Sequence, residues 1–158
     1  MVWRQCGWPA MGRASQTGHD TESKRKSIHL IERKAYMDII DTLRELITDI
    51  MDVEGETITE ETYLVRDLGA ESIDLLELSV SINHAFQITV KDDELYLRNF
   101  RLYIVEAERL GKEPVSYLAE RFPFLATGRI AEILADLEVG PAIKIKDLVS
   151  YIVYRQED

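Results

Sequence analysis

The sequence predicts an all-α helical bundle. Apolar residues recur at helical spacing over residues 32–51, and a second amphipathic helix is predicted from Ser72 to Phe86. Glycine and proline residues separate the later helical patterns at positions where helices begin or end. The chain has 158 residues, which is enough for one ordinary domain with a tail.

The first predicted helix runs from about Glu32 to Met51. Its apolar side chains are Ile39, Ile40, Leu43, Leu46, Ile47 and Ile50. Gly55 follows, where a left-handed helix cap is expected. Residues 54–71 are predicted to form a polar loop that closes with Asp67-Leu68-Gly69-Ala70.

Four helices are predicted after residue 91, over residues 95–110, 114–121, 127–137 and 147–154. Pro114 suits a first helical turn, and Thr127 is expected to cap the next helix. Gly140-Pro141 then separates that helix from the last one.

Charge divides the chain unevenly. Residues 1–30 lack sustained periodicity and are predicted to be a disordered tail, and residues 31–158 form the domain. Residues 1–34 carry a net charge of +4, and the overall charge of −10 leaves −14 for the remainder. An acidic body repels phosphate backbones, so nucleic acid is an unsuitable partner.

With no predicted membrane span or secretion signal, we expect a cytoplasmic monomer.

The residues of the usual catalytic sites are scattered. Cys6 is the only cysteine, and His19, His29 and His84 have no motif around them, so no metal site is predicted. No nucleophile can be paired with a base, and the carboxylates are dispersed over an acidic surface. The sequence therefore predicts a protein that is not an enzyme and has no catalytic residues.

The helix over residues 72–86 has two apolar faces. Leu75, Leu78, Ile82, Ala85 and Phe86 form the expected core face. Ile73, Leu76 and Val80 lie almost opposite, beside Glu71, Asp74 and Glu77. Two interpretations stay open: this second face docks partners, or the later helices of the chain cover it.

Ser72 opens this helix directly after a glycine-containing turn. A phosphate ester on its hydroxyl would lie at the positive end of the helix dipole. The alternative is that Ser72 only caps the helix. A capping box from Ser72 requires Glu or Gln three residues later, and that residue is Leu75.

These residues resemble the acyl carrier protein family. Residues 67–74, DLGAESID, are similar to its modification motif, usually written D-L-G-x-D-S-L-D, with Glu71 and Ile73 as conservative departures. Residues 145–152, IKDLVSYI, are similar to the family's closing pattern T-V-x-D-L-V-x-Y-I. The resemblance covers roughly 75 of the residues after residue 35 and implies a four-helix bundle.

The resemblance implies that Ser72 carries 4′-phosphopantetheine, transferred from coenzyme A by a Mg-dependent phosphopantetheinyl transferase. The arm holds acyl groups as thioesters for fatty-acid or specialised lipid synthesis. The implied partners are acyl synthetases, ketoacyl synthases or acyltransferases with basic patches. They would dock on Glu71, Ile73, Asp74, Leu76, Glu77 and Val80.

The chain departs from the family by an insertion over about residues 93–141, which implies two or three extra helices. The insertion enlarges a cavity for a bulky acyl group, forms a recognition surface, or only extends the core. Phe122-Pro123-Phe124 is either an exposed anchor or a buried loop. Asn83 and His84 stand where many members continue an acidic run, which weakens the charge of this docking face.

Two other functions are compatible with the sequence. One is a helical interaction scaffold that has lost the phosphopantetheine arm. The other is a peptidyl or aminoacyl carrier of a non-ribosomal assembly line. The acidic residues before position 90 favour the acyl carrier over the second alternative.

Overall fold

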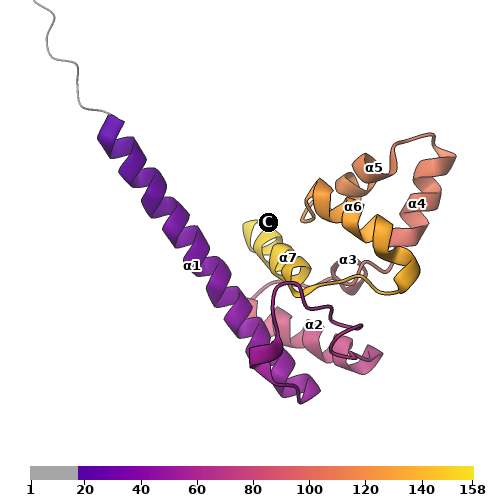
Figure 1. Cartoon of the computed structure of the whole chain (residues 1–158), viewed down its shortest axis with the longest axis horizontal. Coiled ribbons are helices and arrows are strands. Elements are labelled where there is room, and N and C mark those ends of the chain that lie inside the picture. The colour runs from indigo at the N-terminus through magenta and orange to yellow at the C-terminus, as the bar shows by residue number, and fades with distance from the viewer. Residues whose placement is uncertain (1–17) are drawn as a thin grey trace, which may run out of the picture. The chain divides into compact units, whose positions relative to one another are not determined.

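The computed structural model describes residues 18–158, with side chains from residue 21 onward. The chain divides into two compact units, residues 1–34 and residues 35–158. The described residues form helices, 3₁₀ turns and loops, with one isolated β-bridge (Figure 1). The predicted all-α fold is thus confirmed. None of the described helices is long and apolar enough to cross a membrane.

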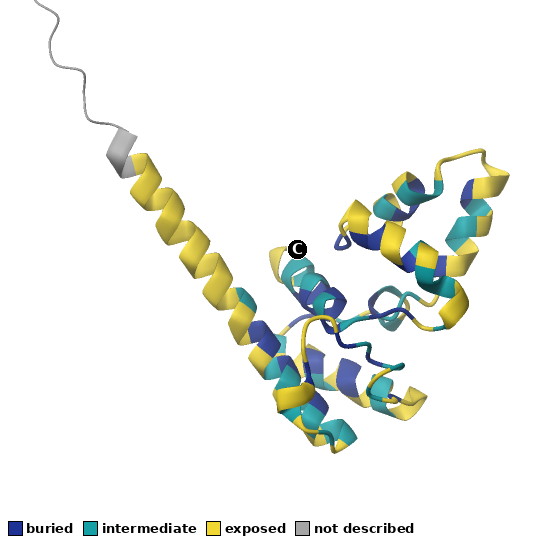
Figure 2. Cartoon of the chain, viewed as in Figure 1, coloured by how far each residue is buried: buried dark blue, intermediate teal, exposed yellow. Residues whose placement is uncertain are grey.

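The first helix, α1 (Gly18–Met51), begins well before the predicted start at Glu32. Residues 18–30 are therefore helical where the sequence predicted a disordered tail, and residues 1–17 of that tail lie outside the described residues. Every side chain of residues 21–34 is exposed (Figure 2). Tertiary packing does not stabilise this helical segment. Local interactions within the helix, such as the ion pair between Lys26 and Glu22 at 3.3 Å, stabilise it instead.

The second unit contains a four-helix bundle. It consists of residues 35–51 of α1 together with α2 (Ser72–Phe86), α3 (Asp92–Leu95) and α7 (Ile145–Glu157). The short 3₁₀ helix η1 (Gly55–Thr57) lies in the loop between α1 and α2. Apolar side chains from all four helices are fully buried together, among them Leu43, Ile47, Leu78, Ile82, Leu95, Leu148 and Ile152.

The inserted segment folds into three helices that lie together in Figure 1. They are α4 (Phe100–Arg109), α5 (Pro114–Arg121) and α6 (Thr127–Asp136), and the 3₁₀ helix η2 (Leu137–Val139) follows. Helix α5 packs against both α4 and α6. The predicted extra helices are thus present.

Aromatic rings pack within the insertion and against α7 of the bundle. Phe122 stacks on Phe100 with ring centroids 5.5 Å apart. Phe124 meets Tyr151 of α7 edge to face at 5.1 Å. Phe122 and Phe124 are both buried, so this segment is a core element and not an exposed anchor.

A buried ion pair also joins the insertion to α7. The Arg129 guanidinium donates two hydrogen bonds of 2.8 Å to the Asp147 carboxylate and one of 2.6 Å to the Ala142 carbonyl. Asp147 also accepts the Lys144 backbone N–H at 2.8 Å, which caps α7. Both side chains of the pair are almost fully buried, so the α6 insertion helix is part of the domain core.

Several predicted boundaries are wrong. The single helix expected over residues 95–110 is two helices, α3 and α4, separated where Leu97 has a left-handed φ of +54°. Asp52, not Gly55, is the left-handed residue after α1. Ala126, not Thr127, is the N-cap of α6, and α7 begins at Ile145.

Candidate functional site

A tight turn precedes Ser72. The Asp67 carboxylate accepts the Tyr63 N–H at 2.8 Å, and the Ala70 N–H donates to the Leu64 carbonyl at 3.2 Å. Gly69 has φ +71°, a left-handed conformation that other residues rarely adopt. Leu64 and Ala70 are buried, so the turn is anchored in the core on both sides of the glycine.

The loop before this turn is fixed to the start of α7. The Leu64 N–H donates to the Ile143 carbonyl, and the Ile145 N–H donates to the Thr62 carbonyl, both at 3.1 Å. Glu61 accepts hydrogen bonds from Lys144 at 2.7 Å and from Lys146 at 2.8 Å. These two ammonium groups lower the pKa of Glu61 to about 2.

Arg66 ties the same turn to the insertion. It bonds the Asp136 carboxylate at 2.6 Å and the Gly140 carbonyl at 2.8 Å. The Tyr63 hydroxyl donates to Asp136 at 2.7 Å, and these bonds from Tyr63 and Arg66 lower the pKa of Asp136. Sequence reasoning missed this cluster, because Arg66 and Asp136 are far apart in the chain and neither lies in a motif.

Ser72 is the first residue of α2, and Glu71 is the N-cap. The capping bond comes from Asp74, whose carboxylate accepts the Glu71 backbone N–H at 2.8 Å. Ser72 is exposed, and its hydroxyl forms no hydrogen bond within residues 18–158. The alternative that Ser72 caps the helix is therefore wrong, since Glu71 and Asp74 fill that role.

The second apolar face of α2 is exposed. The exposed fractions are 64% for Ile73, 51% for Leu76 and 63% for Val80. Glu71 and Glu77 are also exposed, and Asp74 is half-buried. The interpretation that the insertion covers this face is therefore wrong. We call these six residues, which the sequence predicts to dock partners, the docking face.

The opposite side of α2 faces the core, as predicted, with one exception. Leu78 and Ile82 are fully buried, and Leu75 and Phe86 are half-buried, whereas Ala85 is exposed. Ser79, which the sequence did not single out, is buried on this side and donates to the Tyr96 hydroxyl at 3.0 Å.

Asn83 and His84, at the end of α2, are exposed. The Asn83 side-chain oxygen accepts the Val90 N–H at 3.3 Å, so this residue closes the connection after the helix. Among the described residues, no group of three or more His, Cys, Asp or Glu side chains is placed to hold a metal ion.

An exposed serine at the start of a helix, beside an apolar and acidic face, fits the carrier class that the sequence predicts. Comparison with known families supports this class. Residues 41–100 match the family described as "Phosphopantetheine attachment site". The matched segment contains Ser72 and ends at Phe100, the first residue of the inserted helix α4.

Comparison with curated proteins names the acyl group as the cargo of the relatives. The chain is 36% identical to an acyl carrier protein of Wolinella succinogenes over 58 residues, which is 37% of this chain and 76% of the relative. It is 29% identical to the acyl carrier protein of Campylobacter curvus over 77 residues, which is 48% of this chain and all of the relative. The acyl carrier protein of Caulobacter vibrioides is 34% identical over 35% of this chain and 72% of its own length. No solved structure matches the chain.

The chain belongs to the acyl carrier protein family. Its function is that of an acyl carrier, and its cofactor is covalently attached 4′-phosphopantetheine. Members of this family are carriers rather than enzymes. The matches do not favour the two alternatives, a scaffold without the arm and a peptidyl or aminoacyl carrier.

Proposed function

We propose that Ser72 is the residue that carries the 4′-phosphopantetheine arm. The observation that carries this proposal is the exposed hydroxyl without a hydrogen-bond partner at the first position of α2. A serine that capped the helix would have to give up its bond to the backbone before it could react. Here Glu71 and Asp74 perform the capping, and the Ser72 oxygen is free to act as a nucleophile.

The N-terminus of α2 suits a phosphate ester. The N-terminal end of α2 carries the partial positive charge of the helix dipole and backbone N–H groups that the helix itself leaves unpaired. The anchored turn around Gly69 holds the attachment oxygen in one place, so that the arm moves about a fixed point.

The attachment reaction forms one O–P bond and breaks another. The Ser72 oxygen attacks the pyrophosphate of coenzyme A and forms a new O–P bond, and its proton passes to solvent or to a base of the transferase. The P–O bond to the adenosine bisphosphate breaks, and that group leaves. The arm then supplies the terminal thiol on which acyl groups are held as thioesters.

The docking face supplies the contact with partner enzymes. Ile73, Leu76 and Val80 give a small apolar patch, and Glu71, Asp74 and Glu77 surround it with negative charge. Such a face favours fast, salt-sensitive association with basic patches and permits rapid release. We propose that the phosphopantetheinyl transferase and the acyl synthetases, ketoacyl synthases or acyltransferases of a lipid pathway dock there, in the cytoplasm.

The test is the intact mass of the protein before and after incubation with coenzyme A, Mg²⁺ and a phosphopantetheinyl transferase of broad specificity. We expect a gain of one phosphopantetheine that is absent in Ser72→Ala. The matched control is Ser81→Ala, a serine of the same helix, which should be modified normally. A gain that survives in Ser72→Ala contradicts the proposed attachment site.

A further inference from the structure

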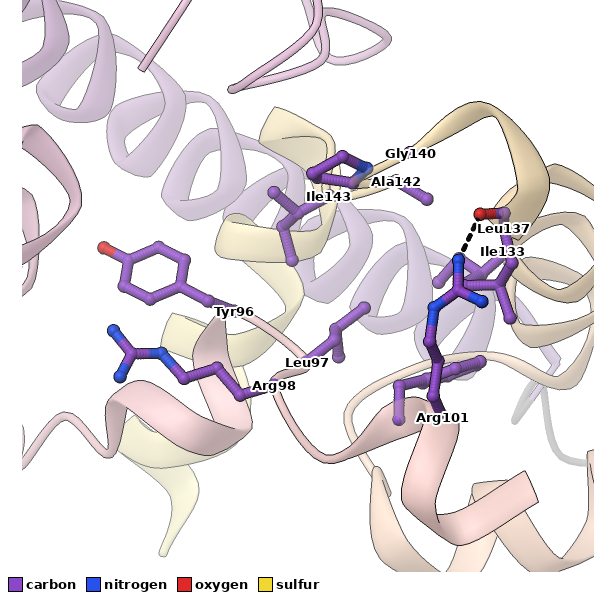
Figure 3. A pocket seen from close by; sticks show the side chains of 11 residues that line it. Tyr96, Leu97, Arg98, Arg101, Ile133, Leu137, Gly140, Ala142 and Ile143 are labelled. Carbon is purple, nitrogen blue, oxygen red and sulfur yellow. Dashed lines mark hydrogen bonds between the residues drawn. The ribbon is translucent and has the colours of Figure 1, made fainter. Parts of the chain in front are cut away.

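A cavity lies where the insertion meets the bundle. Its volume is about 280 Å³. It is bordered by Tyr96 and Leu97 after α3, by Ile133 of α6 and Leu137 of η2, and by Ile143 before α7 (Figure 3). Phe100 of α4 also lines it. The insertion therefore builds most of this cavity, and no residue of α2 lines it.

The lining is mainly apolar. Its hydrocarbon surface comes from six residues: Leu97, Phe100, Ile133, Leu137, Ala142 and Ile143. Arg98 and Arg101 are both exposed and lie at the rim. Apolar cavities hold water poorly and accept hydrocarbon groups of matching size. An alkyl chain is therefore the class of ligand that fits this lining.

Three arginines hold one wall of the cavity in place. This wall is the strap over residues 136–142, whose carbonyl groups accept hydrogen bonds from side chains of three different segments. Arg101 donates to Leu137, Arg66 to Gly140 at 2.8 Å, and Arg129 to Ala142 at 2.6 Å. Charge-assisted bonds of this kind are strong, so the strap is fixed across the cavity and does not collapse into it.

The backbone conformation of Leu97 is a second indication that the surrounding structure maintains this cavity. It adopts a left-handed φ of +54°, which a leucine avoids unless its surroundings impose it. This conformation breaks the helix between α3 and α4 and directs the Leu97 side chain toward the cavity (Figure 3).

Tyr96 separates the cavity from α2. Its hydroxyl donates to the Leu75 carbonyl at 2.7 Å and accepts from Ser79 at 3.0 Å, while its ring lines the cavity. Burial raises the pKa of Tyr96 to about 12, so the hydroxyl stays neutral at physiological pH. Leu75 lies one helical turn after Ser72, and this tyrosine is therefore placed between the carrier core and the cavity.

We propose that this cavity receives the distal end of an acyl chain carried on the arm. The inference rests on the proposed attachment at Ser72. It assigns the insertion a role in cargo binding: the insertion adds apolar volume beyond the bundle core and shields longer chains from water.

The test uses the phosphopantetheinylated full-length chain loaded with butyryl or palmitoyl groups. The readout is the rate at which hydroxylamine cleaves the thioester, which reports how well the chain is shielded. Leu137→Trp fills the cavity, and Val139→Trp is the matched control, since Val139 lies in the same strap, does not line the cavity and is 71% exposed.

We expect Leu137→Trp to speed cleavage of the palmitoyl thioester by roughly tenfold, which corresponds to lost burial of about two methylene groups. The butyryl thioester and the Val139→Trp control should be unaffected. Ala142→Leu, a smaller filling change, should shift palmitoyl cleavage in the same direction, and circular dichroism confirms that each variant is folded.

The two proposals fail in different ways. Normal attachment of the arm with palmitoyl cleavage unchanged in both folded filling variants overturns the cavity proposal and leaves Ser72 as the attachment site. That result would favour the insertion as a recognition surface or an extension of the core. Failure of the arm to attach overturns both proposals.

Discussion

Capping of α2 is the task of Glu71 and Asp74, and Ser72 takes no part in it. Asp74 accepts the Glu71 N–H, whereas the Ser72 hydroxyl has no hydrogen-bond partner in the part of the chain that the structure describes. Ser72→Ala should therefore change the free energy of unfolding by less than about 0.5 kcal/mol. Asp74→Ala should lower it by about 1 kcal/mol, because a capping bond is lost. Urea denaturation of both variants measures the difference, and equal losses would contradict this division of roles.

The lowered pKa of Glu61 predicts that the free energy of unfolding depends on pH. Its pKa is lowered from an ordinary value of 4.5 to about 2 by Lys144 and Lys146, so the ionised carboxylate stabilises the folded state above pH 4.5. This contribution is lost as the pH falls from 4.5 toward 2. Because the group is largely solvent-exposed, we expect Glu61→Gln to cost less than about 1 kcal/mol at neutral pH.

Denaturation of wild type and Glu61→Gln across this pH range provides the measurement. The two stabilities should converge as the solution becomes more acidic. Glu56→Gln, at an exposed glutamate of the same loop, is the control and should track the wild type at every pH. A Glu61→Gln deficit that persists at pH 2 would show that the lysine contacts do not act through charge.

The docking face is formed by several turns of α2 together and not by a single residue. Leu76→Glu should leave the free energy of unfolding nearly unchanged, since Leu76 is half-exposed and lies opposite the core. It should lower kcat/KM of the phosphopantetheinyl transferase roughly tenfold, because a charge replaces an apolar contact. Leu102→Glu is the control on α4, where a similarly exposed leucine lies outside this face. Equal losses for both variants would contradict a docking role specific to α2.

Helix α6 depends on its buried ion pair with α7. Arg129→Met leaves the Asp147 carboxylate buried without its partner and should lower the free energy of unfolding by about 3 kcal/mol or more. Arg98→Met, at an exposed arginine, should have little effect. Thermal and urea denaturation measure both variants. A loss below about 1 kcal/mol for Arg129→Met would show that the insertion folds apart from the bundle.

For the whole molecule, the parts that follow local rules were predictable. The core face of α2 and the turn before Ser72 follow from helical spacing and from the need for glycine at position 69. The exposure of Ile73, Leu76 and Val80 was not predictable, because spacing alone does not say whether a distant segment covers a face.

Long-range contacts account for most of what the sequence did not reveal. Arg129 meets Asp147, and Arg66 meets Asp136, across loops whose path no local pattern encodes. The opposite error occurred in residues 18–30, where composition predicted disorder and the chain forms an exposed helix. There the helix-favouring lysine, arginine and glutamate residues outweigh the lack of a buried face.

The most direct test of the central claim is to locate the modification within the chain. Trypsin cleavage after Arg66 and Lys91 releases residues 67–91, which contain Ser72, Ser79 and Ser81. Fragmentation of this peptide from the modified protein should place the whole phosphopantetheine mass on Ser72. Phosphopantetheine on Ser81 or Ser79, or an unmodified peptide from a protein that carries the added mass elsewhere, would contradict the account.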